Sequence, residues 1–347
     1  MKLPPTEIPI WLAPMGGGVS TPELAAAVAE AGGLGSLGNP YDPPDKIRAQ
    51  VRAVRARTKK PLASNLFVPS KPAIDPQAVA RSIEALKPLF ARKGLPEPKL
   101  AEAQPIDFDA QLAVLIEERI DVFSFTFGIP GKDVFDRCHA AGIAVVGTAT
   151  SVAEARALEA AGVDAVIAQG SEAGAHRGSF LGTPLVGTLA LVPQVVDAVR
   201  IPVIAAGGIM DGRGLTAALA LGATAAALGT AFMRTPEAGT TPGHRKALAA
   251  SRDDSTVVTR VFTGRNARAI ENAFIRALSP IEDQLPAFPI QHGISSPLRQ
   301  AAQKAGDAEM FHVWAGQGAP LGRELPAAEL VRAIAREARE VAARLRL

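Results

Sequence analysis

The stretch Asp164-Ala-Val-Ile-Ala-Gln-Gly-Ser-Glu-Ala-Gly-Ala-His-Arg-Gly178 joins a short apolar run to a polar loop rich in Gly and Ala. The run 164–168 predicts a buried strand, because it is short and apolar. Polar groups just past the carboxyl end of a buried strand are typical of α/β active sites. His176 is the titratable group of this loop whose ordinary pKa is closest to neutrality, so it is the candidate for moving a proton. The alternative is a polar surface loop without chemistry.

The same order of strand and helix occurs eight times along the chain. The expected strands are 8–13, 34–37, 62–67, 122–127, 143–147, 164–168, 202–206 and 223–228. The expected helices of these units include 22–30, 45–57, 109–118, 132–141, 152–161, 188–199 and 212–221. Ser151 and Glu154 predict a capping box at the start of the helix 152–161. Short connections indicate parallel βαβ units, and eight such units most naturally close into an α/β fold of the (β/α)8 TIM barrel type. An open doubly wound sheet is the competing architecture.

Two parts of the chain depart from this order. Residues 68–105 hold many prolines around one helix, 77–92, and predict an insertion after the third strand that is long enough to cover the barrel mouth. After about residue 256 we expect a strand at 257–262, a helix at 268–278, proline-rich loops and an amphipathic helix at 327–344. The expected domains are therefore a barrel, 1–250, with the insertion at about 68–105, and a mostly helical C-terminal subdomain, 251–347, packed on the barrel mouth.

The composition excludes several classes of function. Of 347 residues, 48% are hydrophobic and the net charge is only +3, with the basic residues scattered, so nucleic-acid binding is not expected. The single cysteine, Cys138, excludes an intramolecular disulfide, and the five histidines form no i, i+4 pair, so we expect no metal site. Pro4, Pro5 and Glu7 break any early apolar run, and no stretch suits a membrane span. A cytoplasmic protein without a membrane partner is expected.

Glycines follow the last two expected strands. Gly207-Gly208-Ile209 and Gly229-Thr230 occupy the two loops at which barrels commonly bind phosphate. Glycine lets backbone N–H groups approach a phosphate, and a following helix adds a partial positive charge of about half a unit. These loops predict a phosphate-bearing cofactor or substrate. Gly16-Gly17-Gly18 lacks the spacing of a dinucleotide-binding motif.

Taken together, the motifs of nearly the whole chain resemble the class I nitronate monooxygenases, formerly called 2-nitropropane dioxygenases, which are FMN-dependent TIM-barrel enzymes. The motifs that carry the resemblance are Ala13-Pro-Met15, Ala31-Gly-Gly-Leu-Gly-Ser-Leu-Gly38, Asn65-Leu-Phe67, Ser124-Phe-Thr-Phe-Gly128, Gly170-Ser-Glu-Ala-Gly-Ala-His-Arg-Gly178, Ala205-Ala-Gly-Gly-Ile209, Gly229-Thr-Ala-Phe232 and Trp314-Ala-Gly-Gln-Gly318. The set in this order is specific, although no single motif is. Two positions depart from the family pattern: Thr126 stands where many members carry histidine, and Ala175 where glycine is common.

The resemblance implies FMN as the cofactor and His176 as the catalytic base. Asn65 and Gln169 would hydrogen-bond the polar edge of the flavin, and Gly174 would pass close to it. The implied contacts to the flavin ring come from Ala13, Pro14 and Met15, and those to the phosphate end from Gly207, Gly208, Ala227, Leu228, Gly229 and Thr230.

The expected reaction is oxidation of alkyl nitronates, and of nitroalkanes, by O2 to carbonyl compounds and nitrite. An FMN-dependent NAD(P)H reductase of the quinone or enoyl-ACP type is the alternative, and a non-catalytic flavin-binding protein is a third reading. The partners would be a small nitronate or nitroalkane and O2, with the protein a monomer or homodimer. We expect Glu172 to orient its loop and Arg177 to be a surface cation, with steering of an anionic nitronate as the alternative role of Arg177. We assign no role to Lys304 or Gln317, and no pattern supports one for His244, His292 or His312.

Overall fold

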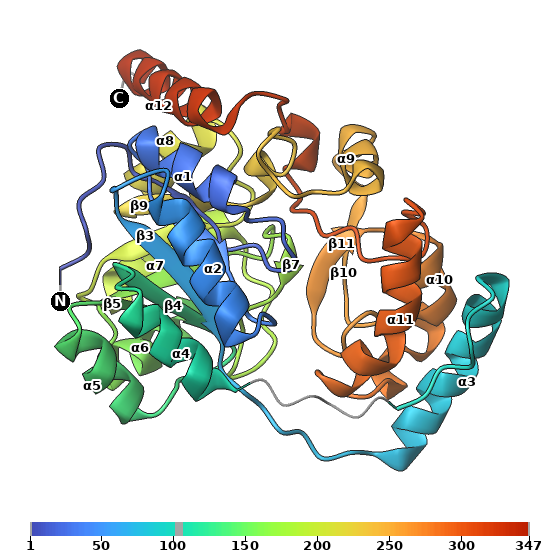
Figure 1. The fold of residues 1–347 in the computed structure, drawn as a ribbon. Helices are drawn as coiled ribbons and strands as arrows, with labels where there is room; N and C mark the ends of the chain where they lie inside the picture. Colours follow the sequence, from blue (N-terminus) through green and yellow to red (C-terminus); the bar gives the residue numbers. More distant parts are fainter. Residues whose placement is uncertain (1, 101–106, 346–347) are drawn as a thin grey trace.

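Eight parallel strands form the centre of the computed structural model, which describes residues 2–100 and 107–345 (Figure 1). Their order around the sheet is β1, β9, β8, β6, β5, β4, β3, β2. The strands are β1 (Ile10–Leu12), β2 (Gly35–Gly38), β3 (Leu62–Phe67), β4 (Val122–Thr126), β5 (Ala144–Ala149), β6 (Ala165–Gln169), β8 (Val203–Ala206) and β9 (Ala225–Leu228). The ring closes where Leu12 N donates to Leu34 O and Leu34 N donates to Ile10 O, each at 2.9 Å. The predicted barrel is confirmed, and the open sheet is wrong.

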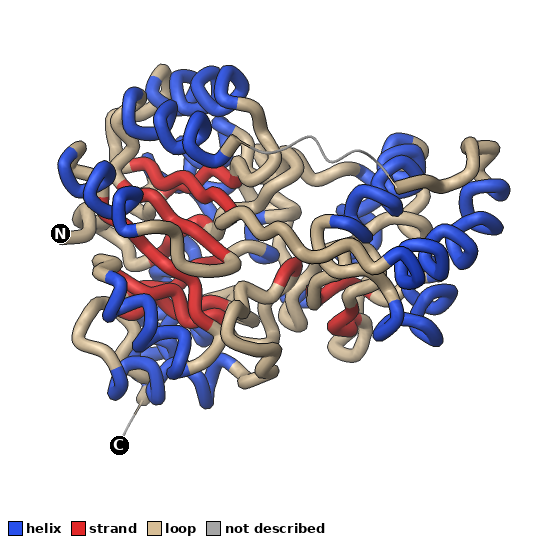
Figure 2. Tube along the Cα trace, turned by 90° about the horizontal axis from the view of Figure 1, so that it is seen from below, coloured by secondary structure: helices blue, strands red, loops and turns tan. Residues whose placement is uncertain are grey.

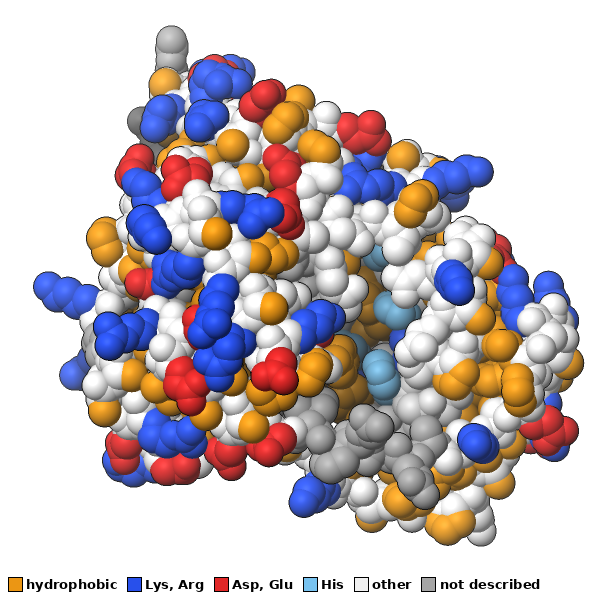
Figure 3. All heavy atoms as spheres, viewed as in Figure 1, with side chains coloured by type: hydrophobic (Ala, Val, Ile, Leu, Met, Phe, Trp, Pro, Cys, Tyr) orange, Lys and Arg blue, Asp and Glu red, His pale blue; other side chains and the backbone are white. Residues whose placement is uncertain are grey.

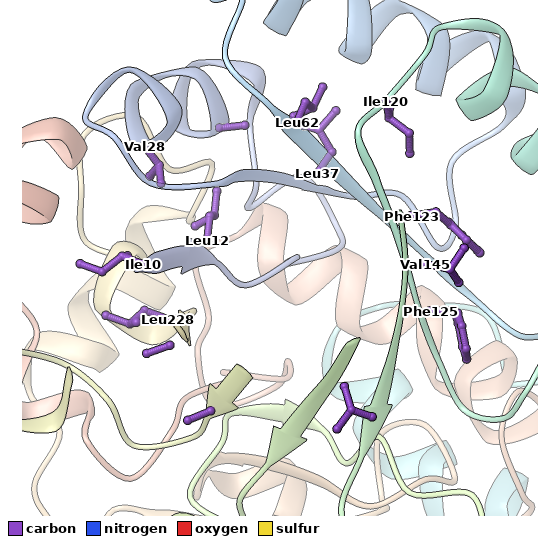
Figure 4. Close-up of a cluster of buried hydrophobic side chains, with 14 of the residues drawn as sticks. Ile10, Leu12, Val28, Leu37, Leu62, Ile120, Phe123, Phe125, Val145 and Leu228 are labelled. Carbon is purple, nitrogen blue, oxygen red and sulfur yellow. The ribbon is translucent and has the colours of Figure 1, made fainter. Parts of the chain in front are cut away.

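Alternate residues of each strand face opposite sides of the barrel wall, as the two-residue period of a strand requires. Ile10 and Leu12 of β1 belong to the core between strands and outer helices, whereas Trp11 belongs to the core inside the ring. Figure 4 shows part of the outer core, with Leu12, Leu37, Phe123 and Phe125 among the labelled side chains. Burying each such side chain contributes about 1.5–3 kcal/mol, so this layer supplies much of the stability of the barrel.

The helices of the barrel lie outside the strands (Figure 1). They are α1 (Pro22–Glu30), α2 (Pro44–Arg55), α4 (Phe108–Glu117), α5 (Lys132–Ala140), α6 (Val152–Ala161), α7 (Thr188–Ala198) and α8 (Gly212–Ala220). α12 (Ala327–Arg344) joins this outer layer against α8 and α1. A Cβ on Gly212 would lie 2.3 Å from the Cβ of Glu337, so α12 packs closely only because residue 212 is glycine.

Only half of the expected capping box forms. The Ser151 hydroxyl accepts from Glu154 N at 3.2 Å, as predicted. The Glu154 carboxylate does not return to Ser151. It is fully buried and accepts instead from Thr150 and from the backbone of Phe180 and Leu181. Glu154 therefore connects the start of α6 to the loop that follows His176.

Beside the barrel lies a second group of helices and short strands (Figure 2), and it contains a hydrophobic core of its own, the second core. It joins α3 (Pro76–Arg92), the helix of the expected insertion, to α11 (Ile290–Lys304) and to α10 (Ala273–Leu278). Ser82 Oγ donates to Gln291 Oε1 at 2.6 Å inside this core. The insertion therefore packs on the C-terminal part of the chain, while its last expected residues, 101–105, lie outside the described residues. The domain boundary at residue 250 stays a prediction.

The sequence prediction is wrong in part of this region. Ala267–Ile270 is not the start of a helix but a strand, β11, paired with β10 (Thr256–Thr259) and with β7 (Ala175–His176). The helix α10 begins later, after Asn272, whose side chain accepts from Ile275 N. α11 was expected as loop, since Gly293 and Pro297 interrupt its sequence, and α9 (Pro242–Ala249) was not expected either. The buried side chains of α11 stabilise it in spite of those residues.

Candidate active site

A cavity of about 440 Å³ lies at the carboxyl ends of the barrel strands, between the barrel and the second core. This volume is within the usual range of small-molecule sites, about 300–1,000 Å³. Figure 3 shows the molecule hollowed there, with histidine side chains inside the hollow. The lining combines apolar side chains of the strands with a few polar groups, which is typical of cofactor sites.

The cavity gathers nearly all residues that the sequence singled out. The lining includes Ala13, Pro14, Met15, Asn65, Gln169, Gly174, His176, Gly207, Gly208, Ala227, Gly229 and Thr230. Leu228 does not line it. Because alternate residues of β9 face opposite sides, Ala227 faces the ring and Leu228 lies in the outer core. What remains of Leu228 near the site is its carbonyl, which accepts from Ala13 N at 2.9 Å.

His176 reaches the cavity on a strand that leaves the barrel. Ala175 and His176 form β7, which pairs with β11 in the second sheet. Gln169, at the end of β6, fixes the turn between them: its Nε2 donates to His176 O at 3.1 Å, and its Oε1 accepts from Gly178 N at 2.8 Å. Ala175 has a φ of 60°, a left-handed value that explains why glycine is common in this position of the family pattern.

The imidazole of His176 is enclosed mainly by aromatic rings. Its centroid lies 5.6 Å from Phe127, 5.8 Å from Phe288 and 5.4 Å from Trp314. Its Nε2 lies 3.0 Å from the hydroxyl of Thr263. Removal from water, and then the nearby His292, Arg265 and Arg299, lower the pKa of His176 to about 3. The ring is therefore neutral at pH 7, with a lone pair on one of its nitrogens.

Two charged residues of the same loop are structural. Arg177 is 1% exposed, so the prediction of a surface cation is wrong; its Nη2 donates to Gln169 O at 2.7 Å and its Nη1 to Gly170 O. The Glu172 carboxylate accepts from Thr188 N at 2.8 Å and from the Thr188 hydroxyl at 2.9 Å. Glu172 thus orients its loop against α7, as predicted.

The phosphate end differs from the expectation in one respect. Gly207 and Gly208 have φ values of 115° and 73°, so the turn after β8 needs glycine. The N-terminus of α8 is occupied, however: Asp211 accepts from the first N–H groups of the helix and Glu337 accepts from Gly212 N. Among the described elements, a phosphate could therefore be held by the two glycine loops and by the short helix η1 (Thr230–Phe232), but not by the start of α8.

Comparison with known proteins agrees with this geometry. The family model described as nitronate monooxygenase matches residues 1–337. The chain belongs to this family. A probable nitronate monooxygenase of Staphylococcus saprophyticus is 42% identical over 329 residues, which is 93% of each chain.

Two solved structures are similar to this member of the nitronate monooxygenase family over most of its length. A nitroalkane oxidase from Streptomyces ansochromogenes has a TM-score of 0.92 and 44% identity, over 97% of both chains. FabK from Thermotoga maritima has a TM-score of 0.77 and 33% identity, over 97% of this chain and 94% of its own. Membership of the nitronate monooxygenase family indicates a flavin cofactor.

Several cavity residues of this family member were not expected from the sequence. Thr263, His244, His292, Arg299 and His312 line the cavity, whereas Lys304 and Gln317 do not. The signal was weak, because these residues stand in a region whose helix and loop order was mispredicted. Among residues 2–100 and 107–345, no group of three or more His, Cys, Asp or Glu side chains could hold a metal ion, and no helix is long and apolar enough to cross a membrane.

Proposed function

We propose that this protein binds FMN and oxidises alkyl nitronates, and nitroalkanes, with O2 to carbonyl compounds and nitrite. The observation that carries the proposal is the neutral imidazole of His176 on the wall of a cavity lined by the family's motifs. Family membership and the 44% identity to a nitroalkane oxidase support the same reaction class.

The lining of the cavity fits a flavin. The apolar side chains of Ala13, Pro14 and Met15 form one wall, suited to a flat ring. Asn65 is 4% exposed and donates to Ser124 Oγ at 3.0 Å, while its Oδ1 accepts nothing from the described residues, so a ligand N–H can satisfy it. Thr230 Oγ1 accepts from Gly316 N at 3.0 Å and keeps its own proton for a phosphate oxygen. FMN is therefore the form of flavin that we propose.

The chain supplies a base with an apolar surround. The imidazole of His176 accepts the proton from the carbon next to a nitro group, and Thr263 holds that ring by the contact at Nε2. The rings of Phe127, Phe288 and Trp314 surround His176 with apolar surface. FMN, when bound, supplies the electron transfer between substrate and O2. A nitronate that arrives ionised needs no base, so His176 matters most for neutral nitroalkanes.

The test is a pair of anaerobic titrations of the purified yellow protein. We expect ethylnitronate to bleach the flavin, and aerobic turnover to release nitrite and acetaldehyde. Chromatography of the released cofactor should identify FMN. Fast bleaching by NADH or NADPH, without bleaching by ethylnitronate, would contradict the proposal and support the reductase alternative. The chain is less similar to FabK than to the nitroalkane oxidase, in both identity and TM-score. The oligomeric state and a cytoplasmic location stay predictions.

A further inference from the structure

We propose that Arg299, His292 and His312 form an oxyanion-binding subsite inside the same cavity, and that it holds an oxyanion group of the substrate. The inference deepens the proposed function and rests on it. We call these three residues the α11 subsite, because two of them stand on α11 and the third is bonded to that helix.

α11 presents two different faces to its surroundings. Ile294, Leu298 and Ala302 recur at intervals of four residues and pack in the second core. The residues of the helix that line the cavity are His292, Ser296, Arg299, Gln300 and Gln303. A helix face that borders a cavity and is polar throughout is suited to a polar ligand rather than to an apolar one.

Arg299 carries a buried positive charge without a carboxylate partner. It is 3% exposed, and none of the described acidic residues forms an ion pair or a hydrogen bond with it. Burial lowers the pKa of its guanidinium to about 10, so it stays charged at pH 7. An unpaired charge in a low-dielectric site is costly, and binding an anion there removes that cost.

The hydrogen bonds of Arg299 leave capacity for a ligand. Nε donates to Ser295 Oγ at 2.9 Å, and Nη1 donates to His312 Nδ1 at 2.9 Å. Nη2 donates to His292 O at 3.1 Å and to His292 Nδ1 at 3.3 Å. A guanidinium has five N–H groups, and Nη1 has two of them. At least one Nη1–H therefore has no acceptor in the described part of the chain.

The same bonds fix the protonation of both histidines. An Arg N–H can donate to Nδ1 only if that nitrogen carries a lone pair, so His292 and His312 each bear their proton on Nε2. Within residues 2–100 and 107–345, no group accepts a hydrogen bond from either Nε2. Both residues line the cavity. Because Nδ1 and Nε2 lie on opposite sides of an imidazole ring, each Nε2–H points away from Arg299. The α11 subsite thus offers two neutral N–H donors with a cation behind them, a combination that suits an oxyanion.

The α11 subsite and the candidate base share one wall. The ring of His312 lies 5.0 Å from Trp314, which in turn lies 5.4 Å from His176. On the other side, Phe288 is 5.8 Å from His176 and 6.0 Å from His292. Only one aromatic ring lies between the α11 subsite and the candidate base on each side, and we infer that one substrate molecule reaches both groups. Its oxyanion is either the nitronate group itself or a carboxylate elsewhere on the same molecule.

The experiment compares Arg299→Met with Lys304→Gln in the FMN-loaded protein. Lys304 stands on the same helix, is exposed and does not line the cavity, so its removal controls for loss of one positive charge. Nitrate, a planar oxyanion that cannot react, serves as the probe. We expect Arg299→Met to weaken nitrate binding, measured by calorimetry, about 10- to 100-fold and Lys304→Gln to leave it within about twofold.

The kinetics then distinguish the two sources of the oxyanion. If Arg299→Met raises the KM of ethylnitronate, the α11 subsite holds the nitronate group. If the KM rises only for a nitronate that also carries a carboxylate, it holds that second group. Arg299→Lys should retain part of the affinity for nitrate, because lysine keeps the charge but lacks the planar guanidinium. If the Arg299→Met protein does not fold, the Arg299→Lys variant takes its place in the comparison. Unchanged nitrate binding and KM in a folded, active variant would overturn the inference while leaving the nitronate reaction intact.

Discussion

Replacing Glu154 by Gln tests whether a buried carboxylate holds the loop after His176. Glu154 Oε2 accepts from Thr150 N at 2.6 Å and from Thr150 Oγ1 at 2.7 Å, while Oε1 accepts from Leu181 N at 2.9 Å and from Phe180 N. A glutamine keeps one accepting oxygen. If its amide nitrogen faces Thr150, the hydroxyl can rotate to accept, but Thr150 N loses its partner.

The magnitude follows from this count. One orphaned buried N–H costs about 1–3 kcal/mol, and the bonds that lose their ionic character add about 1 kcal/mol each. We expect Glu154→Gln to lower the free energy of unfolding by about 3–5 kcal/mol, measured by urea denaturation, and the melting temperature by about 4–7 °C. Glu159→Gln on the same helix is the control, because Glu159 accepts a single bond at the surface, from Arg200 N. A loss below about 1 kcal/mol in Glu154→Gln would refute the reasoning.

Three further predictions concern the site. His176→Asn should retain FMN and lower turnover of neutral nitroalkanes by about 10² to 10⁴, with a smaller effect on preformed nitronates; equal rates on nitroethane would disprove the assignment of the base. Burial lowers the pKa of His176 to about 3, so the ring stays deprotonated as the pH falls. We therefore expect kcat/KM for nitroethane to be level from about pH 8 to about pH 5. A decline centred near the ordinary pKa of histidine would contradict this prediction. A Cβ on Gly174 would lie 2.6 Å from backbone atoms of Ala315 and Gly316, so Gly174→Ala should destabilise the protein by about 1–3 kcal/mol and weaken FMN binding, as thermal melting and fluorescence titration would show.

The barrel could be predicted from the sequence because each of its units carries its own signals. β3 and α6 have the predicted bounds, and Ser151 marks the start of α6 by capping it. The second core offers no such signals. The sequence predicts a helix from residue 268, yet residues 267–270 form a strand that pairs with β10 and with β7, and β7 lies far back in the sequence. Tertiary pairing of this kind overrides local preference.

The residues of the candidate site also fall into those that the sequence predicts and those that it does not. Residues at or just past the ends of barrel strands, such as Gln169 and Gly208, could be predicted because that position indicates a place at the mouth of the barrel. Arg177 was misjudged, because nothing in the sequence shows that two carbonyl groups of its own loop bury it. Arg299 was missed, since its helix was expected as loop and its partners become visible only when α11 forms.

The packing of α3 on α11 has a consequence for how the protein is made. Ser82 and Gln291, which are bonded in the second core, stand 209 residues apart. At the ribosome, where chains grow by about 5–20 residues per second, α3 emerges roughly 10–40 s before its partner helix exists. During that interval the apolar side of α3 is exposed to chaperones and to aggregation. A nascent chain that stalls between β9 and α11 holds all the barrel strands but lacks the wall of the cavity that α11 forms.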